Sequence, residues 1–595
     1  MQKIWQIQNP ISEELKNQFP EIHPIVLQLL YDRGLNSQTK IDEFLNPDYG
    51  QDLHDPFLFL DMEKAIERIF KAVSNREKIL IYGDYDADGV CASVLLMALF
   101  KIFNIAPAIY IPDREHEGYG LNMNAVNEII NKKIDLVITV DCGTSSQTEI
   151  NTLRQNNIDV IVTDHHEQIG TLPATVAVIN PKIANQTYPF SELSGCGVAF
   201  KLAQAILSEK SRKKYQSIFP QTSSVIPSDD RRRHSSRLAG SPSEGGEGSP
   251  GLQTEKSEIT SLSLGLDIGS SSPVIFPPLD KGGRGGVGPV SSHQSEIINQ
   301  QAKITPLPLG LEKWFLDLVA VATVADMCPL LGENRTLVKY GLVVLQKTKN
   351  LGLKALAEIS RTDLRKITTH QIGFQLAPRI NAAGRIDHAS TAYELLITQS
   401  FDHALSIAND LNDKNQKRQN LTDQILTQAK AQLSDIESKK ILIAKGESWP
   451  VGILGLVSGK LTDEYFRPSI ILSQRPDGQM VGSGRSIPIL DITETLGKCQ
   501  DLLIRFGGHS QACGLTLKQE NFEKFVAKIT SVVENTIQPE KLNPTLKIDL
   551  KIPLTEVNME LKERLSQFEP FGQSNQKPTF LSTNLKVVST QPVGR

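Results

Sequence analysis

Three carboxylates stand close together in the run Asp84-Tyr85-Asp86-Ala87-Asp88-Gly89, between a strand-like apolar run and a helix-like segment. Their mutual repulsion would be severe without cations, so the pattern predicts a metal site. An EF-hand loop shares this spacing but needs a glutamate at its twelfth position, where this chain has Leu95. An acidic helix start that complements the helix dipole would account for one of the three aspartates.

More polar residues accompany other apolar runs. Asp141 and the run Asp164-His165-His166 each follow one, and Asp326 stands within another. Carboxylate oxygen together with imidazole suits Mn²⁺ or Mg²⁺. A histidine pair is more often structural, but its place after an apolar run favours a ligand role. An unpaired carboxylate is expensive to bury, so Asp326 needs a partner, which a metal ion would supply.

This set of ligand types predicts a reaction class. Two metal ions about 3.5 to 4 Å apart can activate a shared water and neutralise a pentacoordinate phosphorus, which favours hydrolysis of a phosphoester or phosphoanhydride. We found no serine or cysteine nucleophile motif that competes with this interpretation. Asp141 and Asp326 are better suited to bridging or orienting than to an independent proton relay.

Groups that bind anions come from other parts of the chain. Arginine grips phosphate bidentately, and glycine lets backbone amides approach it. Singly these signals are weak, because Gly-Arg and Gly-Gly pairs are common in turns and Arg385 could instead pair with Asp387. Together they predict a cleft between two domains. The candidates are Arg114, Asn381-Ala382-Ala383-Gly384-Arg385, Ser483-Gly484-Arg485 and Gly507-Gly508-His509.

The elements that would position these residues alternate between strands and helices. Helix-length segments such as Val90–Phe103 and Met123–Asn131 separate short apolar runs, which is typical of a parallel sheet in an α/β domain. The site of such a sheet lies at the carboxyl ends of its strands, where the polar residues fall. The expected strands are Ile79–Tyr82, Ala108–Ile111, Leu136–Val140, Val160–Thr163 and Val176–Ile179.

Composition changes sharply after Lys210, where serine, proline and glycine dominate until about Leu311. We expect this segment to be disordered and without catalytic residues, and Arg231-Arg232-Arg233 in it to be a solvated charge run. A helical run is expected over Trp314–Leu345. A second, Ala404–Ser434, would be a long helix bridging two domains.

A second α/β region follows, with a helix at Ile453–Tyr465 and strands at Ile441–Ala444, Ser469–Leu472 and Met480–Gly482. Alternating stretches at Leu546–Ile552 and Leu581–Val588 suggest the start of a small β domain. We therefore divide the chain into 1–208, the first part of the catalytic domain; 209–310, the insertion; 311–400, its second part; 401–436, the linking helix; 437–540, a substrate-binding domain; and 541–595, the partial β domain.

The overall composition bounds the environment and partners. Of the 595 residues, 39% are hydrophobic and 22% charged, which is enough apolar material for several folded cores. No run is long enough to cross a bilayer, so we expect a cytoplasmic protein without membrane contact. The net charge of −4 means that a polyanion would need a local basic cleft. The cysteines are scattered singly, without a CxxC pair, and are expected to be reduced fillers: Cys91, Cys142, Cys196, Cys328, Cys499 and Cys513.

The candidate ligands together resemble the four signature motifs of the DHH phosphoesterase family: Asp84–Gly89, Asp141, Asp164-His165-His166 and Asp326. Ser483-Gly484-Arg485 and Gly507-Gly508-His509 resemble the family's associated second domain. Gly118-Tyr119-Gly120-Leu121, Asn381–Arg385 and Glu569-Pro570-Phe571-Gly572 are similar to one branch, the bacterial exonucleases that degrade single-stranded DNA from 5′ to 3′. The resemblance covers nearly all of the chain except the insertion.

The resemblance implies an α/β fold. A parallel-sheet DHH domain, a long linking helix and a smaller α/β DHH-associated domain would lead into the start of an OB-like β domain. It also implies a nuclease that uses two ions of Mn²⁺ or Mg²⁺, threads single-stranded DNA between two domains and releases 5′-mononucleotides in DNA repair and recombination. Single-strand-binding protein and a helicase are candidate partners.

Roles carry over by motif match. The implied metal ligands are Asp86, Asp88, Asp141, His165 and Asp326, with Asp84 close by and counted among them. Asp141, His165, His166 and Asp326 are the expected catalytic residues, and His166 would contact the scissile phosphate. Arg114, Ser483 and Arg485 would hold the 5′-terminal phosphate, and Asn381, Arg385 and His509 would line the cleft.

Three features depart from the family pattern. The insertion falls between the third and fourth motifs and must loop out without displacing Asp326. Trp449-Pro450 stands where a Trp-His pair is expected. The OB fold begins near Leu546, and the chain stops at Arg595 before such a domain could be complete.

Two other functions stay open from the sequence. One is a DHH phosphodiesterase of short oligonucleotides or cyclic dinucleotides, which would share the metals but need no long DNA groove. The other is a non-catalytic DHH scaffold, against which the intact ligand set argues. Dependence of cleavage on chain length would separate the first from an exonuclease.

Overall fold

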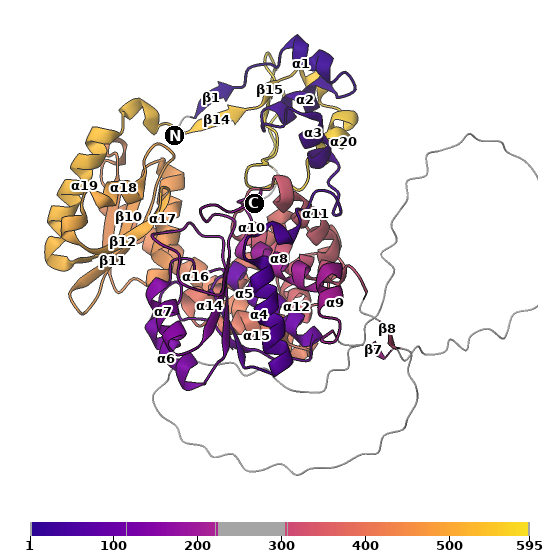
Figure 1. Cartoon of the computed structure of the whole chain (residues 1–595). Helices are drawn as coiled ribbons and strands as arrows, with labels where there is room; N and C mark the ends of the chain where they lie inside the picture. Colours follow the sequence, from indigo (N-terminus) through magenta and orange to yellow (C-terminus); the bar gives the residue numbers. More distant parts are fainter. Residues whose placement is uncertain (1–2, 115, 220–221, 224–303, 306–307, 593–595) are drawn as a thin grey trace, which may run out of the picture.

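The computed structural model describes residues 3–592 except 115, 220–221, 224–303 and 306–307. Figure 1 shows a parallel-sheet domain, a second α/β domain joined to it by a long helix, and a smaller lobe built from both ends of the described chain. Most of the predicted insertion, including Arg231-Arg232-Arg233, lies outside the described residues. In the described part of the chain, no helix is both long and apolar enough to span a bilayer.

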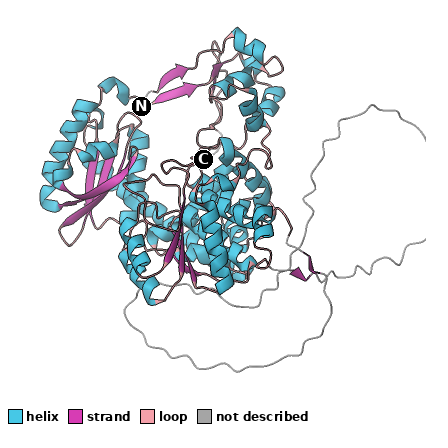
Figure 2. Ribbon diagram, viewed as in Figure 1, coloured by secondary structure: helices cyan, strands magenta, loops and turns pink. Residues whose placement is uncertain are grey.

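The central sheet, drawn in magenta among helices in Figure 2, has five parallel strands in the order β3-β2-β4-β5-β6. Every residue of β2 and β4 is buried, as expected for a sheet covered on both faces. The predicted parallel α/β fold is thereby confirmed. The strands are β2 (Ile79–Gly83), β3 (Ala108–Tyr110), β4 (Leu136–Val140), β5 (Asp159–Thr163) and β6 (Ala177–Ile179).

The two faces of this sheet carry different helices. Ile81 and Ile138 pack into the large core under α4 (Met62–Asn75), α5 (Ala87–Ile102) and α8 (Gly195–Leu207). Leu80 and Val137, one residue earlier on each strand, pack into the opposite core with α6 (Met123–Asn131) and α7 (Gln147–Gln155). Successive strand residues face opposite sides, so both faces are apolar. Helix α5 is buried along almost its whole length, between the sheet and the helices of residues 316–397.

The chain remains folded beyond residue 208, where we placed the end of the first part of the domain. Helix α9 (Glu209–Lys214) follows α8, and Tyr215 and Phe219 pack against Phe70. The short strands β7 (Thr222–Ser223) and β8 (Ile304–Thr305) pair with each other across the undescribed segment.

The helical run expected over Trp314–Leu345 is not a single helix in the structure. It divides into α10 (Leu316–Ala325) and α11 (Gly332–Leu345). Met327 adopts a left-handed φ of 60°, and Pro329 cannot donate a helical hydrogen bond, so the chain turns directly after Asp326. The break leaves Asp326 at the end of α10, with its side chain available to the site.

Further helices complete this domain and lead to the next. They are α12 (Leu351–Ile359), α13 (Thr369–Gln371), a π-helical turn at Ile372–Leu376, α14 (Ala377–Ile386), α15 (Ser390–Ile397) and α16 (Phe401–Gln432). Helix α16 is the predicted linking helix. It contacts α12 and α14 of the first domain and α17 (Val451–Tyr465) of the second.

The second domain contains a five-stranded sheet in the order β12-β13-β11-β10-β9. Only the β9–β10 pair is parallel. The strands are β9 (Leu442–Glu447), β10 (Ser469–Gln474), β11 (Gln479–Arg485), β12 (Leu503–His509) and β13 (Ala512–Lys518), and the helices are α17 (Val451–Tyr465), α18 (Ile492–Gly497) and α19 (Phe522–Thr536).

The smaller lobe joins residues far apart in sequence. Strand β1 (Ile4–Ile7) pairs in parallel with β14 (Thr545–Ile548), and β15 (Leu550–Lys551) pairs with β16 (Phe580–Leu581). One core unites α1 (Glu13–Gln18), α2 (Pro24–Tyr31) and α3 (Gln38–Leu45) with α20 (Met559–Ser566). The stretch Leu581–Val588, expected to be a strand, is one only at its first residue. The first residues of the chain therefore pack with the last segment and not against the central sheet.

Candidate metal centre and adjoining cleft

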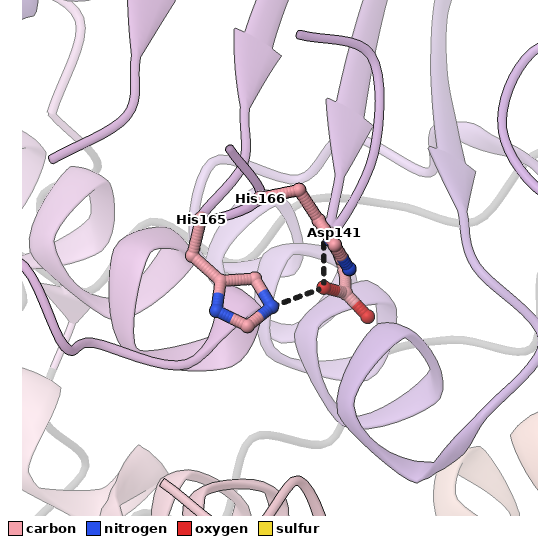
Figure 3. Close-up of side chains that lie close together, drawn as sticks. All are labelled: Asp141, His165 and His166. Atoms are coloured by element: carbon pink, nitrogen blue, oxygen red, sulfur yellow. Dashed lines mark ion pairs between the residues drawn. The ribbon is translucent and has the colours of Figure 1, made fainter. Parts of the chain in front are cut away.

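The candidate ligands converge because three neighbouring strands end at the same edge of the sheet. Asp84 follows β2, Asp141 follows β4 and Asp164 follows β5. Asp141 has a left-handed φ of 61°, which turns the chain sharply as it leaves the strand. Figure 3 shows the side chains of Asp141 and His165 pointing toward each other, with His166 beside them.

His165 is at the middle of the group. Its Nε2 lies 3.1 Å from Oδ1 of Asp141 and 3.8 Å from carboxylate oxygens of both Asp88 and Asp326. Although the 3.1 Å contact is short, its geometry is not that of a hydrogen bond, and both of its atoms are buried without a partner. Oδ1 of Asp84 is also buried and unpartnered. Such atoms are costly to bury unless a cation joins them, so the donor set fits a metal ion.

Three groups of potential ligands meet here. The ligand atoms of Asp84, Asp86 and Asp141 lie within 4.8 Å of one another, as do those of Asp141, His165 and His166. A third group contains His165, Asp326 and Cys328. His165 and Asp141 each belong to two groups, which is what a centre for adjacent ions requires.

Helix ends hold two of the carboxylates. Asp86 caps α5, since its Oδ1 accepts hydrogen bonds from the backbone N–H groups of Asp88 and Gly89 at 2.8 and 3.1 Å. Asp88 accepts two bonds of 2.7 Å from the first N–H groups of α8, those of Gly195 and Cys196. These bonds use part of each carboxylate's acceptor capacity and fix its orientation.

Burial and crowding make this set of carboxylates electrostatically unfavourable without cations. Burial, followed by the neighbouring carboxylates, raises the pKa of Asp84 and Asp141 well above the ordinary range. The same causes raise the pKa of Asp88 to about 7 and that of Asp326 to about 6. Burial lowers the pKa of His165, which favours the neutral imidazole that binds metals. Cations would let the carboxylates ionise together.

His166 is placed differently from His165. Its Nδ1 lies 2.9 Å from Oδ1 of Asp164 and 2.8 Å from the hydroxyl of Tyr119. Burial acts to lower the pKa of His166, but the Asp164 carboxylate outweighs it and raises that pKa to about 9. Asp164 also accepts a bond from the backbone N–H of Thr144, and its pKa falls to about 2. His166 is therefore a cation held at the rim of the centre.

A cleft of about 580 Å³ adjoins the centre and lies between the two α/β domains. Tyr85 and Tyr119 line it next to the metal centre. Four arginines line it as well, two from each domain: Arg114, Arg385, Arg485 and Arg505. Polar and glycine residues of both domains complete its wall, among them Gly384, Gly452, Gly455 and Ser483.

The arginines are held in place but keep donor capacity. Arg485 donates to the carbonyl of Gly484 at 2.9 Å and to the hydroxyl of Ser483 at 3.3 Å. Arg385 donates from Nη1 to the carbonyl of Gly452 at 3.1 Å, while its buried Nε has no partner. Burial and the positive charge of Arg114 lower the pKa of Arg385 to about 9. Such a concentration of buried positive charge calls for an anion.

The structure brings most of the predicted site residues together. The predicted metal ligands lie in adjoining groups that share Asp141 or His165, with Asp88 beside His165, and the cleft is lined by Arg114, Arg385, Ser483 and Arg485. Asn381 and His509 are not among its lining residues. Asn381 instead accepts a hydrogen bond of 2.8 Å from the backbone N–H of Ala87, which steadies the first motif. The backbone carbonyl of His509 accepts a hydrogen bond from the hydroxyl of Thr493, whereas its side chain has no hydrogen bond among the described contacts.

Sequence reasoning missed several neighbours of the site. The hydroxyl of Tyr119 contacts His166, and the thiol of Cys328 donates to Asp326. Arg505 lines the cleft. Tyr119 belongs to the Gly118–Leu121 motif that carried part of the resemblance, but no role at the site was predicted for it, whereas nothing local marks Arg505. Trp449 is buried, donates to Gln428 and packs near α16, so the Trp-Pro departure falls in a core.

Comparisons with known proteins identify three regions. The DHH family N-terminal domain matches residues 78–225, the DHHA1 domain matches 438–535, and the RecJ OB domain matches 548–595. The single-stranded-DNA-specific exonuclease RecJ of Bacillus subtilis is 31% identical over 99% of this chain, which spans 63% of that protein's length. RecJ of Escherichia coli is 27% identical over 94% of this chain and 83% of its own length.

Solved structures agree on the fold. RecJ from Thermus thermophilus in complex with Mn²⁺ has a TM-score of 0.71 at 23% identity and covers 97% of this chain and 69% of that one. A manganese-bound exonuclease RecJ has a TM-score of 0.57 at 25% identity, covering 81% of this chain and 97% of that one.

Proposed function

The chain belongs to the RecJ family of DHH phosphoesterases, and from this premise we propose that it is a metal-dependent exonuclease that hydrolyses single-stranded DNA from the 5′ end to 5′-mononucleotides. One observation carries the proposal. The carboxylate–imidazole centre opens beside an arginine-lined cleft between two domains, with Tyr85 and Tyr119 at the junction. Chemistry for a phosphodiester therefore lies next to groups that bind phosphate.

The ions of this centre would be two Mn²⁺ or Mg²⁺. Their ligands would be Asp84, Asp86, Asp88, Asp141, His165 and Asp326, and the unpartnered buried atoms of Asp84, Asp141 and His165 support this assignment. When bound, the ions supply an activated water and stabilise charge on the phosphorus. The two RecJ structures compared above are bound to manganese, which agrees with the oxygen-rich donor set of this chain.

The chain's own residues would orient the substrate. The protonated His166, held by Asp164, would donate to an oxygen of the scissile phosphate. Arg114, Ser483 and Arg485 would hold the 5′-terminal phosphate in the cleft, with Arg385 deeper between the domains. An anchor for the terminal phosphate accounts for the direction, since only a free 5′ end could place its first linkage at the metals.

The wider setting is also a proposal. We infer that the enzyme acts in the cytoplasm, in DNA repair and recombination. A helicase and single-strand-binding protein are the partners that would supply the single strand it needs, because a narrow cleft between domains excludes a duplex.

The test is release of mononucleotides from 5′-phosphorylated single-stranded DNA in Mn²⁺, with duplex and 3′-blocked DNA as controls. The proposal expects products that are 5′-mononucleotides, unaffected by the 3′ block and absent with duplex. Cleavage restricted to dinucleotides would instead indicate a phosphodiesterase of short substrates. Folded, metal-loaded protein without activity on any of these would indicate a scaffold.

A further inference from the structure

Cys328 places a thiol within the metal centre. It lies in the turn after α10, two residues beyond Asp326, and its side chain is buried. Its Sγ donates to Oδ2 of Asp326 at 3.2 Å. The ligand atoms of Cys328, Asp326 and His165 all lie within 4.8 Å of one another, which is the spacing of a cation's ligands before the cation is bound.

His165 supplies the independent sign of a ligand. Its Nε2 is buried and has no hydrogen-bond partner, and the residue is only 8% exposed. That atom faces the carboxylate of Asp141 on one side and the Asp326–Cys328 pair on another. His165 therefore lies beside Asp141, which belongs to the all-oxygen group with Asp84 and Asp86, and is itself a member of a group that includes sulfur.

The two groups should prefer different ions. Oxygen ligands suit Mn²⁺ and Mg²⁺, whereas thiolate with imidazole selects Zn²⁺ and its heavier relative Cd²⁺. Zn²⁺ also ranks above Mn²⁺ for a given set of nitrogen, oxygen and sulfur ligands. A thiol at this position therefore gives thiophilic ions an advantage that a purely oxygen-and-nitrogen centre would lack.

We propose that Cys328 is a metal ligand, and that His165, Asp326 and Cys328 together bind a thiophilic divalent cation, Zn²⁺ or Cd²⁺, in competition with the hard ion of the same centre. In this step a sulfur–metal bond forms, the thiol proton passes to solvent water, and no group changes its oxidation state. This inference rests on the metal centre of the proposed function but not on its nuclease activity. It also revises the sequence-based interpretation of Cys328 as a filler.

The other cysteines provide controls. Cys142 directly follows Asp141, yet it packs in the apolar core beside Leu80 and Val137. Cys499 is buried in the core of the second domain. Neither belongs to a group of potential ligands among the described residues. The variant Cys499→Ala therefore removes a buried thiol while leaving the metal centre unchanged.

The test is titration of metal-free, reduced full-length protein with Cd²⁺, followed by the ultraviolet thiolate-to-cadmium charge-transfer band. Wild type and Cys499→Ala should develop the band, and its intensity at saturation should correspond to about one thiolate per bound Cd²⁺. Cys328→Ser should lose the band, and its Cd²⁺ affinity should fall more than about tenfold, while its Mn²⁺ affinity changes less than about threefold. Zn²⁺ should then inhibit the Mn²⁺-loaded variant less than wild type.

A cadmium charge-transfer band that survives in Cys328→Ser would overturn the proposal. So would wild-type protein that binds Mn²⁺ but develops no such band when titrated with Cd²⁺. If wild type binds neither ion, the metal centre of the proposed function fails too. A second measurement uses wild type alone, so it does not depend on how Cys328→Ser folds. Bound Cd²⁺ should protect Cys328 from an alkylating reagent, and peptide mass spectrometry locates the alkylated cysteines. Equal alkylation with and without saturating Cd²⁺ would also contradict the proposal.

Discussion

Gly195 and Asp141 lie so close that a β-carbon built on Gly195 would stand 2.5 Å from Oδ1 of Asp141. Helix α8 begins at Gly195, whose N–H also donates to Asp88. The start of this helix therefore approaches one predicted ligand, Asp141, closely and orients another, Asp88, and glycine is the residue that permits both.

We expect Gly195→Ala to lower Mn²⁺ affinity by more than about tenfold, because the added methyl group must displace a ligand carboxylate. Gly197→Ala on the same helix is a matched control, since its β-carbon would make ordinary contacts of 3.5 Å. Isothermal titration with Mn²⁺ distinguishes the two variants. Equal affinities in both would remove the argument that α8 shapes the centre.

Arg485 should contribute to recognition of the terminal phosphate. We expect Arg485→Ala to lower kcat/KM for 5′-phosphorylated single strands by roughly 10- to 100-fold, which is the effect of losing a hydrogen bond to a charged group. The kcat/KM for 5′-hydroxyl strands should fall much less. Arg365→Ala, at an exposed arginine paired with Asp363, should leave both unchanged. An equal loss on the two substrates would indicate a structural role for Arg485.

Arg335 of helix α11 connects the lobe formed by both ends of the described chain to the domain of the central sheet. Its buried guanidinium donates to the carbonyls of Phe44, Gln567, Phe568 and Glu569 at 2.7 to 2.9 Å. Arg335→Ala removes these four bonds, and among the four carbonyls that of Phe568 still accepts a bond from Asn575. We expect a loss of about 3–5 kcal/mol of local stability.

Hydrogen exchange should report that loss as faster exchange in residues 38–45 and 567–575, and little change in β4. Arg564→Ala, which removes an exposed pair with Glu560, is the control and should leave both segments protected. Unchanged protection in Arg335→Ala would mean that the apolar core of the lobe suffices to hold it.

Asp317 makes stability depend on pH. Burial raises its pKa to about 6, despite hydrogen bonds from Thr348 and the backbone N–H of Leu318. A carboxyl whose folded pKa lies above its unfolded value binds more protons when folded. Its contribution is present below the unfolded pKa and is lost as pH rises to about 6.

Asp317→Asn removes this titration. Relative to wild type, the variant should gain unfolding free energy between about pH 4 and 6, by up to about 3 kcal/mol, and hold that gain above pH 6. Urea unfolding at a series of pH values measures the difference. A difference that stays constant across this range would show that Asp317 does not titrate there.

Much of the fold was predictable because its signals are local. Fully buried parallel strands appear as short apolar runs, and Asp84, Asp141 and Asp164 follow three of them, so strand order alone brings them together. The long helix α16 was equally visible. The break after Asp326 was missed, because an apolar run continues on both sides of it and the turn depends on Met327 and Pro329.

Contacts between distant segments could not be predicted. Nothing in Ile4–Ile7 specifies β14 as its partner, since pairing depends on the lobe that encloses both strands. Asn381 and His509 show the same limit within the site. Both types bind phosphate well, but the Asn381 side chain is committed to Ala87, and neither residue lines the cleft.

We propose above that carboxylates at the ends of neighbouring strands, together with His165, hold two ions. Direct measurement is Mn²⁺ binding by electron paramagnetic resonance, comparing wild type with Asp141→Ala, because Asp141 belongs to two of the ligand groups. We expect two Mn²⁺ per wild-type chain with the spin coupling of adjacent ions, and loss of that coupling in Asp141→Ala. Uncoupled or absent Mn²⁺ in wild type, or coupling that survives in Asp141→Ala, would contradict it.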